Sequence, residues 1–113
     1  MGQLIYDRTR PIDVDDRVLY HLQLVIINKL RRRENFALTL GDETRNSTMW
    51  INPNTGLEFI YHGNRTPAVN RTWLEVLAIA ANSNRGLSLV PEPPDGMIPD
   101  ELRENQRSKE LQL

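Results

Sequence analysis

The chain has 113 residues, of which 26% are charged, a net charge of −1 and no cysteine. A chain of this length forms one domain with a core that needs no disulfide, and the lack of cysteine excludes thiolate zinc sites and a cysteine nucleophile. No segment has the ~20 apolar residues of a membrane span or the apolar run of a signal peptide, so we expect a cytoplasmic protein without a membrane partner.

The charges are divided unevenly along the chain. Residues 1–91 hold eleven Lys and Arg against nine Asp and Glu, whereas residues 92–113 hold three against six and are rich in proline. Such a change in composition is typical of a domain boundary. We therefore predict a single domain over residues 1–91 and an acidic, Pro-rich C-terminal tail over residues 92–113 that is flexible or weakly helical.

The first predicted elements are a short strand over Gly2–Tyr6 and a long helix over Asp13–Arg33, separated by a polar break at Asp7–Pro11. Asp13 is expected to cap the helix, and the arginines at its end suit the negative pole of the helix dipole. Apolar residues recur at helical spacing and predict a core-facing side. This side consists of Val18, Leu19, Leu22, Val25, Ile26 and Leu30.

A second apolar stripe lies on the other side of the predicted helix. Tyr20, Leu24 and Ile27 follow the same spacing, although a helix that lies on one sheet should be polar on its outer face. Burying one such side chain is worth roughly 1.5 to 3 kcal/mol, so a cover is expected. The second helix, a long loop or another copy of the chain could supply it.

Alternating apolar residues predict three further strands, at Phe36–Leu40, Ser47–Asn52 and Leu57–His62. The last two flank Pro53–Gly56, a sequence typical of a tight turn, and are predicted to form a β-hairpin. The core-facing side of its second arm consists of Leu57, Phe59 and Tyr61.

A second helix is predicted to begin at Asn70 or Thr72 and to extend to about Asn82, because both residues are good N-caps and Thr72 opens a capping-box pattern. Leu87–Val90 is a last short strand. The predicted fold class is α+β: a small, mainly antiparallel sheet of about five strands with two helices packed on one face, in the order β-α-β-β-β-α-β.

No set of residues with catalytic or metal-ligand spacing is visible. His21 and His62 have no second ligand at helix or hairpin spacing, and the serines lack a nucleophile-elbow context. Asp13, Asp15 and Asp16 could hold a hard cation, but a helix N-terminus explains them without an ion. We therefore expect no catalytic residue, no metal and no cofactor.

Basic residues from several segments form a candidate anion or nucleic-acid surface. If they converge, the N-terminus of the second helix with Arg65 and Arg71 beside it favours a phosphate or a carboxylate. The alternative is that they are ordinary solvated side chains. The set consists of Arg17, His21, Arg31, Arg32, Arg65, Arg71 and Arg85.

Three stretches are distinctive: the opening G-x-L-x-Y-D, residues 15–36 (DDRVLYHLQLVIINKLRRRENF) and residues 70–93 (NRTWLEVLAIAANSNRGLSLVPEP). Together they resemble a small family of uncharacterised proteins of similar length from actinobacteria and their phages. Members of that family are often labelled ATP-dependent DNA ligases, a class that uses a lysine nucleophile in a K-x-D-G motif. Neither Lys29 nor Lys109 lies in such a motif, so the resemblance implies at most an association with ligases.

The leading hypothesis is a non-enzymatic interaction or adaptor protein that binds a protein partner or forms a homodimer through Tyr20, Leu24 and Ile27. The alternative is a nucleic-acid-binding accessory module for DNA transactions that uses the arginines, for which salt-sensitive binding is expected. An enzyme ranks third because no set of acid, base and nucleophile is visible.

Overall fold

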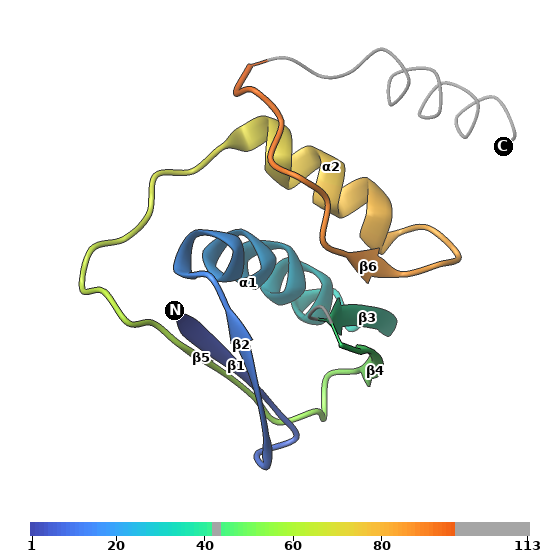
Figure 1. The fold of residues 1–113 in the computed structure, drawn as a ribbon. Coiled ribbons are helices and arrows are strands. Elements are labelled where there is room, and N and C mark those ends of the chain that lie inside the picture. Colours follow the sequence, from blue (N-terminus) through green and yellow to red (C-terminus); the bar gives the residue numbers. More distant parts are fainter. Residues whose placement is uncertain (42–43, 97–113) are drawn as a thin grey trace, which may run out of the picture.

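The computed structural model describes residues 1–41 and 44–96, and most of the predicted tail, residues 97–113, lies outside this part. The fold class is α+β, as predicted (Figure 1). No helix within the described ranges is long and apolar enough to cross a membrane. In chain order the elements are β1 (Gly2–Tyr6), β2 (Arg10–Val14), α1 (Asp16–Arg31), β3 (Phe36–Gly41), β4 (Asn46–Ile51), β5 (Leu57–Ile60), α2 (Arg71–Ala81) and β6 (Leu87–Ser88).

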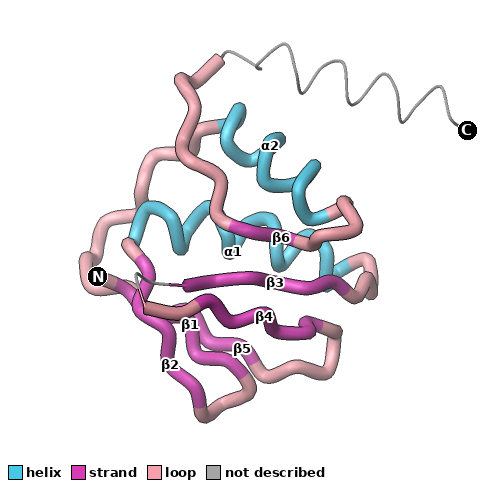
Figure 2. The backbone as a smooth tube through the Cα atoms, turned by 45° about the vertical axis from the view of Figure 1, so that its right-hand side comes forward, coloured by secondary structure: helices cyan, strands magenta, loops and turns pink. Residues whose placement is uncertain are grey.

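The six strands form two three-stranded sheets instead of the single predicted sheet (Figure 2). One sheet has the order β2-β1-β5 and is antiparallel throughout. The other has the order β4-β3-β6, in which β3 pairs antiparallel with β4 and parallel with β6. A parallel pair needs a long connection, and here that connection contains β4, β5 and α2.

The predicted hairpin of Ser47–Asn52 and Leu57–His62 is wrong. β4 pairs with β3, and β5 pairs with β1. Asp7 N donates a hydrogen bond to Gly56 O at 2.8 Å, which directs the chain after the turn onto β1 and away from β4. Pro53–Gly56 therefore connects the two sheets and does not fold one strand back onto its neighbour.

The strand β2 was not predicted, because Pro11 and the polar residues before it indicated a break. Ile12 and Val14 nevertheless alternate toward the core. β2 lies at the edge of its sheet, where proline is tolerated. Asp7 and Arg8 have φ angles of 52° and 69° and form the tight turn between β1 and β2.

As a consequence, α1 begins later than predicted. Asp15 is the N-cap in place of Asp13, and its carboxylate accepts a hydrogen bond from Arg17 N at 3.2 Å. Asp13 belongs to β2 and accepts a hydrogen bond from Gln3 Nε2 on β1 at 3.1 Å.

The face predicted for the first helix lies in the core. Its buried residues are Leu19, Leu22, Val25 and Ile26, with Val18 and Leu30 packed at the margin. The predicted face of β5 and the residue after it also packs against this core, through Leu57, Phe59 and Tyr61. The second helix contributes the buried residues Trp73, Val76, Leu77 and Ala81.

The helices α1 and α2 lie side by side and run in the same direction (Figure 1). Their N-terminal ends are joined because Asn70 N donates to His21 Nε2 at 2.9 Å. Their C-terminal ends are joined because Lys29 Nζ donates to Asn82 Oδ1 at 2.7 Å. The two ends of the helix pair therefore carry different polar contacts.

After β6 the chain returns to the N-terminal end of α2 (Figure 1). We call residues 90–96 the strap. Trp73 Nε1 donates to Val90 O at 2.8 Å, and Thr72 Oγ1 accepts from Gly96 N at 2.9 Å. Residues 92–96 of the predicted tail thus lie against α2.

Replacing Gly86 with alanine should destabilise the fold more than the same change at Gly96. Both glycines have positive φ, 80° and 84°. A Cβ at Gly86 would lie 2.5 Å from Ala37 O on β3, whereas a Cβ at Gly96 meets nothing within 4 Å. We expect Gly86→Ala to lower the free energy of unfolding by about 2 to 4 kcal/mol, of which the left-handed backbone accounts for about 1 to 2 kcal/mol, and Gly96→Ala to show only that backbone cost or less. Urea unfolding measures both values, and equal losses would contradict the predicted contact with β3.

Candidate functional site

His21, predicted as part of an anion surface, is fully buried between the two helices. Its Nε2 accepts the Asn70 N–H at 2.9 Å, and its Nδ1 lies 2.7 Å from Arg17 O. Because a backbone N–H can only donate, we assign the proton to Nδ1, which donates to Arg17 O. The ring also packs on Trp73, with 4.6 Å between ring centroids. His21 is therefore a neutral link between α1 and α2.

Arg17 is held by the strap. Its Nε and Nη2 donate to the two carboxylate oxygens of Glu92 at 2.8 and 2.6 Å, and its Nη1 donates to Ala68 O at 2.8 Å. Asn70 Nδ2 donates to the same carboxylate at 2.9 Å. The Arg17 guanidinium and the Asn70 amide lower the pKa of Glu92 from 4.5 to about 2, and the Glu92 hydrogen bond raises the pKa of Arg17.

A carboxylate from within the chain lies at the start of the second helix, where the sequence offered a site for a phosphate or a carboxylate if the basic residues converge. Asn70 caps α2, because its Oδ1 accepts from Trp73 N at 3.1 Å. The carboxylate beside this helix end is the protein's own Glu92, which the sequence assigned to the tail. Arg17 and His21 are therefore occupied within the fold.

The remaining predicted arginines are divided between the two ends of the helix pair. Arg65 and Arg71 are exposed near the N-terminal end of α2, whereas Arg31, Arg32 and Arg85 are exposed at or just beyond the C-terminal ends of the helices. The 11 residues of α2 separate these two ends, roughly 16 Å at 1.5 Å per residue. The seven predicted residues therefore do not form one site.

Asp16, in the first turn of α1, binds the backbone of the loop after β5. Its carboxylate accepts hydrogen bonds from Gly63 N at 3.0 Å and from His62 N at 3.2 Å, and these bonds lower its pKa. They attach the loop after β5 to α1. Within the described residues no three His, Asp or Glu side chains are placed to hold a metal ion.

The second stripe of α1 is only partly covered. Tyr20 and Leu24 are half-buried, and Ile27 is 39% exposed. Tyr20 makes an edge contact with the ring of Tyr61, at 6.4 Å between centroids, and the Tyr61 hydroxyl donates to Gln23. Burial raises the pKa of Tyr61 to about 12. The loop side of the stripe is thus partly covered, and its Ile27 end is open.

An apolar groove of about 260 Å³ lies between the outer faces of α1 and α2. Leu24 lines it from α1, and Leu74 and Ala78 line it from α2. Arg32 and Glu75, which have opposite charges, also line this groove. The second helix therefore covers one flank of the predicted stripe and leaves a hollow beside it.

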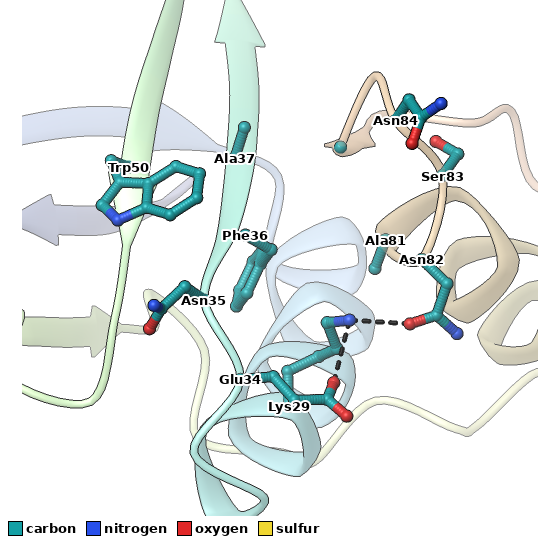
Figure 3. Close-up of a pocket in the computed structure, with 11 residues that line it drawn as sticks. Lys29, Glu34, Asn35, Phe36, Ala37, Trp50, Ala81, Asn82, Ser83 and Asn84 are labelled. Carbon is teal, nitrogen blue, oxygen red and sulfur yellow. Dashed lines mark hydrogen bonds and ion pairs between the residues drawn. The ribbon is translucent and has the colours of Figure 1, made fainter.

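At the other end of the helix pair, the ammonium group of Lys29 is buried (Figure 3). Lys29 Nζ lies 2.9 Å from Glu34 Oε2 and donates to Asn82 Oδ1, and it stands 5.7 Å from the centre of the Phe36 ring. The Lys29 hydrogen bond lowers the pKa of Glu34. Lys29 is thus paired within the fold, and Lys109 lies outside the described residues.

Trp50 is a functional candidate that the sequence interpretation missed. It is 56% exposed and stands between two open hollows of about 570 and 620 Å³. Figure 3 shows its indole beside the first hollow. The signal was present, because Trp50 shares its face of β4 only with the polar residues Asn46 and Thr48, opposite Met49 and Ile51, which are both buried. A large aromatic residue on the outer face of a strand is a candidate contact residue.

The Arg17–Glu92 pair should make stability depend on acid pH. Because the folded-state pKa of Glu92, about 2, lies below its ordinary value of 4.5, the pair stabilises the fold fully above about pH 5. This contribution is lost as the pH falls toward 2. We expect the free energy of unfolding of Glu92→Gln to be lower than that of the wild type at pH 6 and to fall less steeply between pH 5 and 2.

Chemical denaturation at a series of pH values measures this difference. Glu58→Gln, which removes a carboxylate from the outer face of β5, is the control for the loss of one negative charge. A Glu92→Gln profile parallel to that of the wild type would contradict the assigned pair.

A family model, described as a domain of unknown function (DUF7882), matches residues 1–92. No characterised protein and no solved structure matches the chain. The matched range contains both helices, all six described strands and Glu92, the residue that closes the network around Arg17. The chain therefore belongs to the DUF7882 family.

Proposed function

We propose that the protein is a non-enzymatic interaction module that forms a homodimer through the outer faces of α1 and α2. The observation that carries this proposal is the open Ile27 end of the stripe on α1, next to the apolar groove between the helices. Tyr20 and Leu24 extend the same surface. An apolar strip beside a groove is typical of a surface that binds another protein.

The charges beside the groove favour a second copy as the partner. In a two-fold dimer the same patch meets itself, so a residue on one copy faces a different residue of the same patch on the other. Arg32 and Glu75 both line the groove, from different helices. An antiparallel approach of two helix pairs brings Arg32 of each copy toward Glu75 of the other. Ala78 is small and permits a close approach of the backbones.

The polar groups support a binding role in preference to catalysis. His21 is buried and hydrogen-bonded through both ring nitrogens, and Lys29 is paired with Glu34. The resemblance to proteins of actinobacteria and their phages fits a small cytoplasmic adaptor. The ligase label fits only as an association with such an enzyme, because Lys29 offers no free amine for adenylylation.

Replacing Ile27 with glutamate should dissociate the homodimer. A buried, unpaired carboxylate at the centre of the contact should weaken the dimer at least about ten-fold. Sedimentation velocity over a range of protein concentrations measures the effect. Ile60→Glu is the matched control, because Ile60 is 38% exposed but lies on β5, away from the groove.

The wild type and Ile60→Glu should sediment as concentration-dependent dimers, and Ile27→Glu as a monomer with an unchanged circular dichroism spectrum. A wild-type protein that remains monomeric at millimolar concentration would refute self-association. Equal loss of the dimer in both variants would place the contact elsewhere.

A further inference from the structure

A second surface, on the sheet β4-β3-β6, exposes the indole of Trp50. Trp50 lies on the edge strand β4, and its partner across the pair is Ala37 on β3. Alanine is too small to cover an indole, so one face of the ring remains available. The other tryptophan, Trp73, is buried and hydrogen-bonded to Val90. Of the two tryptophans, Trp50 is therefore the exposed one.

Two unpaired cations lie beside Trp50. Arg31 and Arg33 line the same hollow of about 620 Å³. Neither guanidinium makes a hydrogen bond or an ion pair with any described residue. The nearby acid does not neutralise them, because the Glu34 carboxylate is paired with Lys29 at 2.9 Å and with Arg32 at 3.6 Å. The hollow therefore combines an aromatic face with free positive charge.

Amide side chains complete the lining of this hollow. Asn35, Asn52 and Asn54 all contribute to it, and Asn35 also lines the hollow on the other side of Trp50. Asn52 Oδ1 accepts from Asn54 N at 2.8 Å, which fixes this part of the turn. The side-chain nitrogen Nδ2 of Asn52 and both polar atoms of the Asn54 side chain make no hydrogen bond with described residues. Such groups can donate to and accept from the edges of nucleobases.

We propose that Trp50, Arg31 and Arg33 form a binding site for single-stranded nucleic acid. One base stacks on the indole, the guanidinium groups contact the adjoining phosphates, and the asparagine amides contact the base edge. A stacking platform beside a positively charged hollow is the arrangement by which proteins bind single strands with little sequence preference. This site is separate from the helix groove of the proposed homodimer.

The chemistry favours a single strand over two other anionic ligands. A duplex keeps its bases stacked and offers no free base face to Trp50. An acidic peptide would pair with Arg31 and Arg33 but would not need the indole. A single strand uses both the exposed indole and the two arginines, which distinguishes it from a duplex and from an acidic peptide.

Titration of fluorescein-labelled twelve-nucleotide oligothymidylate and oligouridylate with the full chain tests the proposal by fluorescence anisotropy. We expect binding of one or both at 20 mM salt, with quenching of tryptophan fluorescence. Two phosphate contacts predict about a 25-fold loss of affinity on raising the salt to 200 mM. The two oligonucleotides show whether DNA or RNA binds more tightly.

Substitutions then distinguish the contribution of base stacking to affinity from that of overall positive charge. Trp50→Ala should weaken binding roughly 5- to 100-fold, the range for the loss of one stacked base, whereas Trp50→Phe should retain most of it. The double variant Arg31→Gln/Arg33→Gln should also lose binding. Arg65→Gln/Arg71→Gln is its matched control, since it removes the same charge from exposed positions at the opposite end of the helix pair.

Several results would overturn the proposal. These are no binding of either oligonucleotide at 20 mM salt, equal losses in the two double variants, or tighter binding of duplex or of a polyglutamate peptide. Ile27→Glu should bind oligonucleotide as the wild type does, so failure of the homodimer and failure of this site give different results. Circular dichroism confirms that each variant is folded.

Discussion

The fold depends on how one buried residue, Asn70, is satisfied where the two helices begin. Its backbone N–H donates to His21, its side-chain oxygen accepts from Trp73 N, and its side-chain nitrogen donates to Glu92 and to Pro93 O. A buried polar group without a partner costs about 1 to 3 kcal/mol, so each of these contacts constrains the position of a different segment. Together they fix α1, α2 and the strap relative to one another.

Because these polar groups are bonded within the fold, the two candidate binding surfaces lie elsewhere, in the groove between the helices and on the sheet face around Trp50. At the N-terminal end of the helix pair, Arg17 and His21 are hydrogen-bonded within the fold. The groove between the helices is mainly apolar, and the sheet face around Trp50 is aromatic and basic. We propose that burial of apolar area drives binding at the first surface, and that stacking and phosphate contacts drive it at the second. The two proposals therefore differ in their response to salt.

The spacing of apolar residues predicted the features that depend on neighbouring residues in the chain. The core face of α1 and a cap at Asn70 or Thr72 follow from helical spacing and residue type, which act within a few residues, and the structure has the cap at Asn70. Strand pairing is a long-range property, and a turn-like Pro53–Gly56 cannot show which strands it connects. The sequence likewise indicated an anion at the start of α2, but only the folded chain brings Glu92 to Arg17, 75 positions away. The alternation of β4 shows which of its residues face the core, but it does not show what surrounds Trp50 on the opposite face.

The position of Glu92 has a consequence for how the molecule assembles. This residue is the last one of the family match, and it supplies the carboxylate that closes the network around Asn70. During synthesis the helices and strands leave the ribosome before this carboxylate does. The domain therefore acquires this contact only at its C-terminal boundary, so an interrupted chain can contain every helix and strand and still lack the carboxylate that bridges Arg17 and Asn70.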